Sequence, residues 1–128
     1  MTVRRFLAAA ALSLFAVGCS GQSGYNIDVR NDTNEPIALD LKTEKKNEQP
    51  KVVDTFHVGA GATSRHFTQI DSKSKVTLEA QVEGETARPA ATMPLTLGET
   101  HVDVVPQHGN AVSDPKSPRV RLREREGH

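Results

Sequence analysis

Several residue types are scarce in this chain, and their scarcity limits what it can be. Tryptophan is absent, and beyond residue 18 the only aromatic residues are Tyr25, Phe56 and Phe67. The core of any folded part must therefore consist mostly of Val, Ile, Leu and Ala. A single cysteine, Cys19, is present in the 128 residues. The remainder of the chain therefore has no thiol for redox or metal chemistry.

The chain also lacks an apolar run long enough to cross a membrane. Its main apolar run, Phe6–Val17, covers twelve uncharged residues, of which only Ser13 is polar. A helix of that length reaches only about 18 Å, against a hydrocarbon core of roughly 30 Å. The run follows Arg4 and Arg5 and ends at small residues, so residues 1–18 are predicted to be a signal peptide.

The lone cysteine lies directly after this predicted signal peptide. The sequence Ala16-Val17-Gly18-Cys19 resembles the lipobox of bacterial lipoproteins, with Ala16 where that family usually has Leu. The resemblance implies cleavage after Gly18 and attachment of lipid to the sulfur of Cys19. An unpaired thiol in an exported protein is a liability unless it is used, which favours this interpretation over an incidental free cysteine.

Lipid attachment would determine where the protein works. Two or three acyl chains hold a domain stably on a membrane, whereas one gives only reversible binding. The lipoprotein resemblance implies the multi-chain case, so we expect a protein anchored in a bacterial cell envelope, facing the periplasm or the exterior. Ser20, rather than Asp, follows the cysteine, which is compatible with sorting to the outer membrane.

The rest of the chain is predicted to comprise a lipidated cysteine and tether at 19–24, a domain at 25–105 and a disordered tail at 106–128. Residues 24–105 contain 13 acidic and 9 basic residues, a net charge of −4. Nucleic acids are bound by clustered Lys and Arg, so we expect no nucleic-acid partner.

The tail is rich in Pro, Gly, Asn, Ser and Asp, a composition that buries too little apolar surface to fold alone. Its last segment, Arg119–Glu126, alternates Arg with apolar or acidic residues. Three interpretations stay open for this segment: a solvated terminus, an eighth strand that uses Val120 and Leu122, or a contact for anionic lipid, polysaccharide or an acidic partner.

Alternation of apolar and polar residues predicts the strands of the domain. Tyr25–Arg30 and Ile37–Lys42 alternate with period two around a turn-rich segment, which predicts a hairpin. A second hairpin is predicted from Val52–Val58 to Thr63–Thr68 through Gly59–Ala62. Further strands are predicted at Lys75–Glu83, at Ala87–Met93, where Pro89 favours an edge, and at Thr100–Val105.

About seven short strands without a 3.6-residue period predict an all-β fold, a small antiparallel β-sandwich of immunoglobulin or transthyretin-like type. The cysteine pair and tryptophan of true immunoglobulin domains are missing. A sheet curled into an open barrel is the alternative architecture.

The histidines are the candidate ligands for a metal site. In the predicted second hairpin, His57 and His66 would lie diagonally on one face of the sheet. His101 and Asp103 on the last predicted strand, or Met93, could complete a site for copper or zinc. No H-x-H or H-x-x-x-H spacing concentrates ligands locally, so histidines on the wet face of a sheet explain the pattern better.

Catalytic patterns are also missing. Ser64 and His66 alternate onto one strand face, but no G-x-S-x-G motif is present. We expect a non-catalytic binding or structural module without a cofactor, which contacts an envelope protein or a wall polymer. A periplasmic copper- or zinc-binding protein is the alternative.

Overall fold

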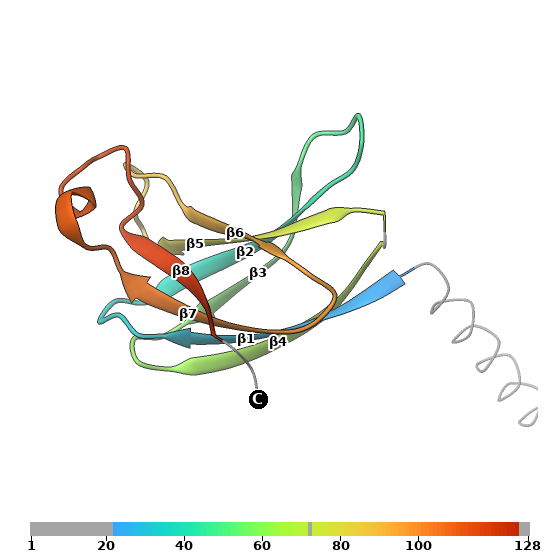
Figure 1. Cartoon of the computed structure of the whole chain (residues 1–128), viewed down its shortest axis with the longest axis horizontal. Helices are drawn as coiled ribbons and strands as arrows, with labels where there is room; N and C mark the ends of the chain where they lie inside the picture. Colours follow the sequence, from blue (N-terminus) through green and yellow to red (C-terminus); the bar gives the residue numbers. More distant parts are fainter. Residues whose placement is uncertain (1–21, 72, 126–128) are drawn as a thin grey trace, which may run out of the picture.

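The structure, a computed structural model, describes residues 22–71 and 73–125. The predicted cleavage after Gly18 and lipidation of Cys19 lie outside the described residues. The fold is all-β, with eight strands in two four-stranded sheets packed together as a sandwich (Figure 1). In chain order these are β1 (Gln22–Asn31), β2 (Ile37–Glu44), β3 (Lys51–Val58), β4 (Thr63–Asp71), β5 (Lys75–Val82), β6 (Ala91–Leu95), β7 (Gly98–Pro106) and β8 (Val120–Arg125).

Sheet A has the strand order β4-β1-β7-β8, and sheet B has the order β3-β2-β5-β6. The pairing of β1 with β7 is parallel, and every other pairing among the described strands is antiparallel. The predicted β-sandwich is therefore confirmed in outline, with eight strands instead of about seven.

Period-two alternation sets the buried face of each strand. On β5, Val76, Leu78, Ala80 and Val82 all lie in the core, as their spacing predicts. On β1 and β2, the predicted inward residues are buried too: Tyr25, Ile27, Val29, Ile37, Leu39 and Leu41. Because aliphatic residues from both sheets meet in the middle, the core forms with Tyr25 as its only buried aromatic residue among those described.

Both predicted hairpins are wrong, although their strands are correct. β1 pairs with β4 and β7, whereas β2 pairs with β3 and β5. The segments 32–36 and 59–62 therefore cross from one sheet to the other. Alternation shows that a strand has one buried face, but both sheets of a sandwich bury such a face, so the pattern cannot distinguish a hairpin from a crossover.

Asn31 holds these two crossovers together at the end of β1. Its side chain is fully buried, and its amide nitrogen donates to the carbonyl oxygens of Glu35, Val58 and Gly59 at 2.8, 3.0 and 3.1 Å. Its side-chain oxygen accepts hydrogen bonds from the backbone N–H and hydroxyl of Thr33 at 2.9 and 2.7 Å. One polar side chain thus fixes both segments that pass between the sheets.

The predicted disordered tail is wrong for residues 106–125. A short 3-10 helix occupies Gly109–Val112, and β8 pairs antiparallel with β7. Val120 is 3% exposed in the core, so the eighth-strand interpretation of this segment is confirmed. The first residues of β1 also belong to a strand and not to a tether, so the folded part extends beyond the predicted 25–105.

Arg88 explains why a segment of such polar composition is ordered. Its guanidinium donates to the carbonyl oxygens of Ala111, Val112, Asp114 and Ser117 at 2.7–2.8 Å. These bonds satisfy backbone acceptors that would otherwise need water. A residue of the β5–β6 connection thus holds the connection between β7 and β8.

Candidate functional site

Four strands lie at sheet edges, and they differ in how well their free backbone groups are protected. An exposed edge offers unpaired N–H and C=O groups to another chain unless a bulge, a proline, a charge or short length prevents pairing. β6 has five residues and contains Pro94. β8 has six residues and carries Arg121, Arg123, Glu124 and Arg125. β3 has a register shift opposite Leu41 and Lys42, which interrupts its regular pairing.

β4 is less protected than these three edges, although it carries the charged residues Arg65 and Asp71. It is nine residues long, contains neither proline nor glycine, and pairs with β1 in one continuous register from Thr63 to Asp71. Its free side therefore presents the longest regular row of backbone donors and acceptors among the four edges. It carries one basic residue, Arg65, whose side chain is 66% exposed.

Phe67 places one exposed apolar side chain on the otherwise polar outer face of β4. Its side chain is 63% exposed, the largest exposed fraction among the large apolar residues of the described chain. The ring lies against Gly24 of β1, where an added Cβ would come within 3.3 Å of the Phe67 Cε1 atom. Glycine at position 24 thus makes room for an aromatic ring that lies flat on the sheet surface.

The flank formed by β3 and β4 is here called the open flank. Polar and aromatic side chains lie between the two sheets there. His66 Nε2 is hydrogen-bonded to the Asp54 carboxylate, and the His66 ring stacks on Phe56 with centroids 4.5 Å apart. Both His66 and Asp54 point inward, because their partners in the sheets are the buried Ile27 and Leu41. These inward polar groups interrupt the core in the middle of this flank, whereas Val58 of β3 and Ile70 of β4, on either side of them, are buried in it.

Where β3 begins and β4 ends, the open flank widens into a hollow of about 260 Å³. Its lining includes Thr43, Val53, Thr68 and Ile70. By contrast, the flank formed by β6 and β8, here called the closed flank, is filled by apolar side chains. Ala91, Leu95 and Val120 are buried there, and Met93 and Leu122 pack against them.

The outer face of sheet A carries a network of opposite charges. Asp103 is 1% exposed and lies 3.2 Å from the guanidinium nitrogens of both Arg30 and Arg123. Arg125 Nε lies 2.9 Å from Asp103 Oδ1, an ionic contact without hydrogen-bond alignment. His101 lies between two carboxylates, 3.0 Å from Asp28 and 3.0 Å from Glu99. These charges are matched within the sheet, so the network stabilises β7 and β8 in their places.

The three candidate metal ligands, His57, His66 and His101, lie on three different faces of the two sheets. His57 is exposed on the outer face of sheet B, 3.0 Å from the Glu83 carboxylate. His66 points inward on sheet A, and His101 lies on the outer face of sheet A. The predicted diagonal pair of His57 and His66 is wrong, because β3 and β4 are in different sheets. Within residues 22–71 and 73–125, no group of three or more His, Cys, Asp or Glu residues could hold a metal ion.

Ser64, His66 and Asp54 share the inward side of the open flank, but they do not form a nucleophile–base pair. Asp54 is hydrogen-bonded to His66, whereas no hydrogen bond joins Ser64 to His66 in the described structure. Without that bond the imidazole cannot take the proton of the hydroxyl as it does in a serine hydrolase. The geometry therefore gives no support to hydrolytic chemistry at this flank.

A hollow of about 510 Å³ lies at the end of the sandwich where the crossovers meet. Arg119 lies there, 2.8 Å from Glu35 and 3.5 Å from Glu85. The backbone N–H of Ala87, and then the guanidinium of Arg119, hold the pKa of Glu85 below its usual value. Arg88, which also lines this hollow, donates to four carbonyl oxygens. The charged groups that line this hollow are therefore mainly bonded to the connections between the strands.

Sequence reasoning missed the importance of Phe67, Asn31 and Arg88. The exposure of Phe67 depends on which strands end up at sheet edges. Asn31 and Arg88 act through carbonyl oxygens up to 29 residues away in the chain. The Asn-Asp-Thr-Asn segment that begins at Asn31 did carry a turn signal, but nothing local marks Arg88.

Comparison of the chain with protein-family models, curated proteins and solved structures finds no match. In the part of the chain that the structure describes, no helix has the length and apolar character needed to cross a membrane.

Proposed function

We propose that this protein is a lipid-anchored, non-catalytic module of a bacterial cell envelope. Cleavage after Gly18 and acylation of Cys19 would leave Gln22, the first residue of β1, three residues from the lipid. The lipobox resemblance and the position of the only cysteine support the anchor. Ser20 is compatible with an outer-membrane location.

Replacement of the anchor residue tests this address. Cys19→Ala removes the sulfur that would carry the lipid, so we expect the protein to leave the membrane fraction. Ser20→Ala is the matched control, and its protein should stay with the membrane. Mass spectrometry of the wild-type amino-terminal peptide should detect acylated cysteine. An unmodified Cys19, or a Cys19→Ala protein that stays with the membrane, would contradict the anchor.

Within the β-sandwich class, we propose a transthyretin-like rather than an immunoglobulin-like arrangement. Immunoglobulin constant domains keep their first two strands in one sheet, with strands A, B, E and D opposite C, F and G. Here the first two strands belong to different sheets, and the first and seventh are parallel neighbours. Of the two types that the sequence left open, this strand order therefore favours the transthyretin-like one.

We further propose that the module binds an extended segment of another envelope protein by strand addition to β4. The observation that carries this proposal is the long, regular nine-residue edge of β4 beside the exposed ring of Phe67. In strand addition, backbone hydrogen bonds supply affinity, and alternate side chains supply specificity. A polypeptide offers matching N–H and C=O groups at every second residue, which a wall polysaccharide does not, so we infer a protein partner.

In-cell photocrosslinking tests this proposal. A photoreactive amino acid in place of Phe67 should yield a covalent adduct with one envelope protein. The same amino acid in place of Val112 is the matched control. Val112 is apolar and 53% exposed, and it lies in the connection between β7 and β8, away from β4. We expect at least a severalfold weaker adduct from position 112. Equal adducts from both positions, or an adduct of twice the chain mass, would contradict a separate protein partner on β4.

A further inference from the structure

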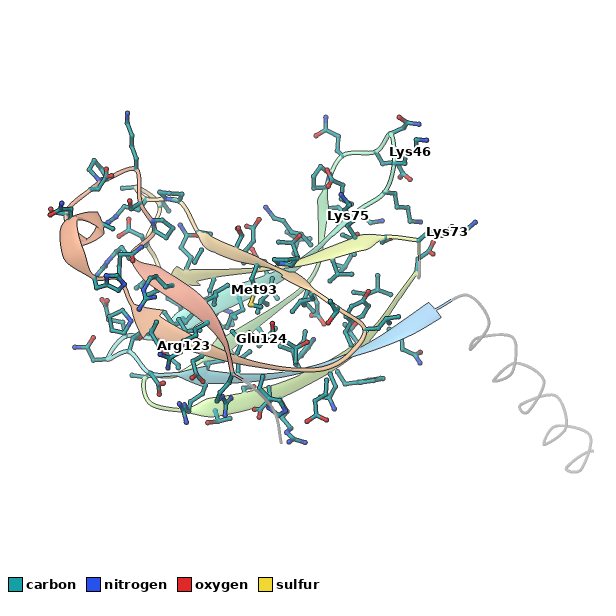
Figure 2. The ribbon with its side chains drawn as sticks, viewed as in Figure 1. Lys46, Lys73, Lys75, Met93, Arg123 and Glu124 are labelled. Atoms are coloured by element: carbon teal, nitrogen blue, oxygen red, sulfur yellow. The ribbon has the colours of Figure 1, made fainter. Side chains whose placement is uncertain are left out.

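Lysines gather at the end of the sandwich where β1 begins. Lys45, Lys46, Lys73 and Lys75 line a hollow of about 400 Å³ together with Glu44, Asn47 and Glu48. Figure 2 shows Lys46, Lys73 and Lys75 at this end: Lys46 lies on the β2–β3 connection, Lys73 on the β4–β5 connection, and Lys75 is the first residue of β5. Here this group is called the lysine end.

Most of these ammonium groups are free to bind an external anion. Lys45 lies 3.1 Å from the carboxylate of Asp71, which ties the β2–β3 connection to the end of β4. Among the residues that the structure describes, Lys46, Lys73 and Lys75 make no ion pair. Three cations without an ion pair thus line this hollow, together with the carboxylates of Glu44 and Glu48.

The two ends of the sandwich have opposite charge. At the lysine end, the β2–β3 and β4–β5 connections with the strand residues that flank them carry five basic and three acidic residues: Lys45, Lys46, Lys51, Lys73 and Lys75 against Glu44, Glu48 and Asp71. At the other end, the connections carry three basic and five acidic residues: Arg88, Lys116 and Arg119 against Asp32, Glu35, Glu83, Glu85 and Asp114. An anionic surface therefore attracts the lysine end and repels the opposite one.

An exposed apolar side chain lies at the same end. Leu97, in the turn between β6 and β7, is 60% exposed. The chain also enters β1 here, at Gln22. Gln22 follows Cys19 by three positions, and a fully extended chain spans at most about 11 Å over three residue steps. A lipid on Cys19 would therefore hold this end close to the bilayer.

We propose that the lysine end rests on the membrane and that its lysines bind the phosphate groups of anionic lipid headgroups. This inference rests on the lipid anchor proposed above. In this orientation the strands run away from the bilayer, and the free edge of β4 stands out from the membrane along its length. The lysines thus fix the direction in which the anchored module presents its binding edge.

Fluorescence quenching in vesicles tests the orientation. Because Cys19 is the only cysteine and would be acylated, an introduced cysteine carries a unique label. Labels on Gln49→Cys at the lysine end and on Asn110→Cys at the other end are placed in the full-length lipidated protein. The protein is reconstituted in phosphatidylglycerol or phosphatidylcholine vesicles that contain a headgroup-linked quencher. We expect severalfold stronger quenching at position 49 than at position 110, in phosphatidylglycerol vesicles.

Charge removal identifies the lysines as the cause. Each lysine near an anionic surface raises the equilibrium constant for contact by about fivefold, so Lys46→Gln with Lys73→Gln should lower that constant by about 25-fold. Arg65→Gln with Lys116→Gln removes the same charge elsewhere and should leave the quenching unchanged. High salt should also weaken the effect, because it screens exposed charges beyond a few ångströms.

The anchor and the headgroup contact can fail separately. Flotation of the protein with the vesicles reports the anchor, whereas the difference between positions 49 and 110 reports the orientation. A protein that does not float overturns the anchor and this inference with it. A protein that floats but is quenched equally at both positions, or that is unaffected by the paired lysine substitutions, overturns the headgroup contact alone.

Discussion

The two flanks of the sandwich close the gap between the sheets in different ways. At the closed flank, apolar side chains from β6 and β8 extend the core to the surface. At the open flank, the inward pair of His66 and Asp54, with the ring of Phe56 stacked on His66, interrupts the apolar layer. The closed flank is thus apolar along the contact between its two strands, whereas the open flank has polar groups in its middle and ends in the long edge of β4.

This difference shows how a small domain can expose an edge without losing its fold. The crossovers at the end of the open flank are fixed by Asn31, and the connections at the end of the closed flank are fixed by Arg88. In both cases a side chain donates hydrogen bonds to the backbone carbonyl oxygens of segments outside the strands or at their ends. The accessible edge of β4 therefore begins at a rigid crossover.

Asn31→Ala should have the largest effect, because it removes the bonds that fix both crossovers of the open flank. Three buried or partly buried carbonyl oxygens lose their donor, which should lower the free energy of unfolding by about 3 kcal/mol. Urea denaturation measures this change. Asn34→Ala, at an exposed asparagine in the same crossover, is the control and should change stability by less than about 0.5 kcal/mol. Equal effects of the two substitutions would show that Asn31 does not hold the crossovers.

Arg88→Ala should have the next largest effect, at the other flank. The segment 107–119 would lose the donor of four hydrogen bonds, which should cost about 2 kcal/mol. Hydrogen exchange should become faster in β8 while β4 changes little. Arg88→Lys should not restore protection, because a lysine ammonium cannot reproduce the planar fork of a guanidinium. Unchanged exchange in β8 would mean that β8 is held by its pairing with β7 alone.

Asp71→Asn should have the smallest effect, and the effect should depend on pH. The backbone N–H of Lys73, and then the ammonium of Lys45, hold the pKa of Asp71 below its usual value of 3.8. A lowered folded-state pKa stabilises the fold above the unfolded-state pKa, and this contribution is lost as the pH falls through the folded-state pKa. The variant should therefore be slightly less stable at pH 7 and equal to wild type near pH 2. Thermal unfolding at both pH values checks this.

The control for this prediction is Glu48→Gln, which removes an exposed carboxylate at the same end. It should show no comparable pH-dependent difference from wild type. If Asp71→Asn is as stable as wild type at every pH, the Lys45–Asp71 pair does not restrain the β2–β3 connection.

The sequence predicted the strands and their buried faces well, because alternation reports burial directly. It did not predict how the strands pair. Ile37, Leu39 and Leu41 face Tyr25, Ile27 and Val29 across the core rather than beside them in one sheet. Both arrangements have the same alternation, so only three-dimensional contacts could decide between them.

The site was harder to predict than the fold for the same reason. Composition indicated a disordered tail because it could not show that Arg88 binds the carbonyl oxygens of a segment more than twenty residues away. The exposed edge of β4 is a consequence of strand order, and the sequence of β4 alone does not reveal it. Likewise, the pairing of His57 with His66 depended on a hairpin that does not form.

The most direct test of the proposed binding edge is hydrogen exchange of the complex captured from Phe67, compared with the protein alone. Strand addition should protect alternate amides of β4, those that point away from β1, because each gains a backbone acceptor from the partner. The amides at the free edges of β3, β6 and β8 should exchange as before. Protection gained at one of those edges, or only in the connecting loops, with β4 unchanged would contradict the account.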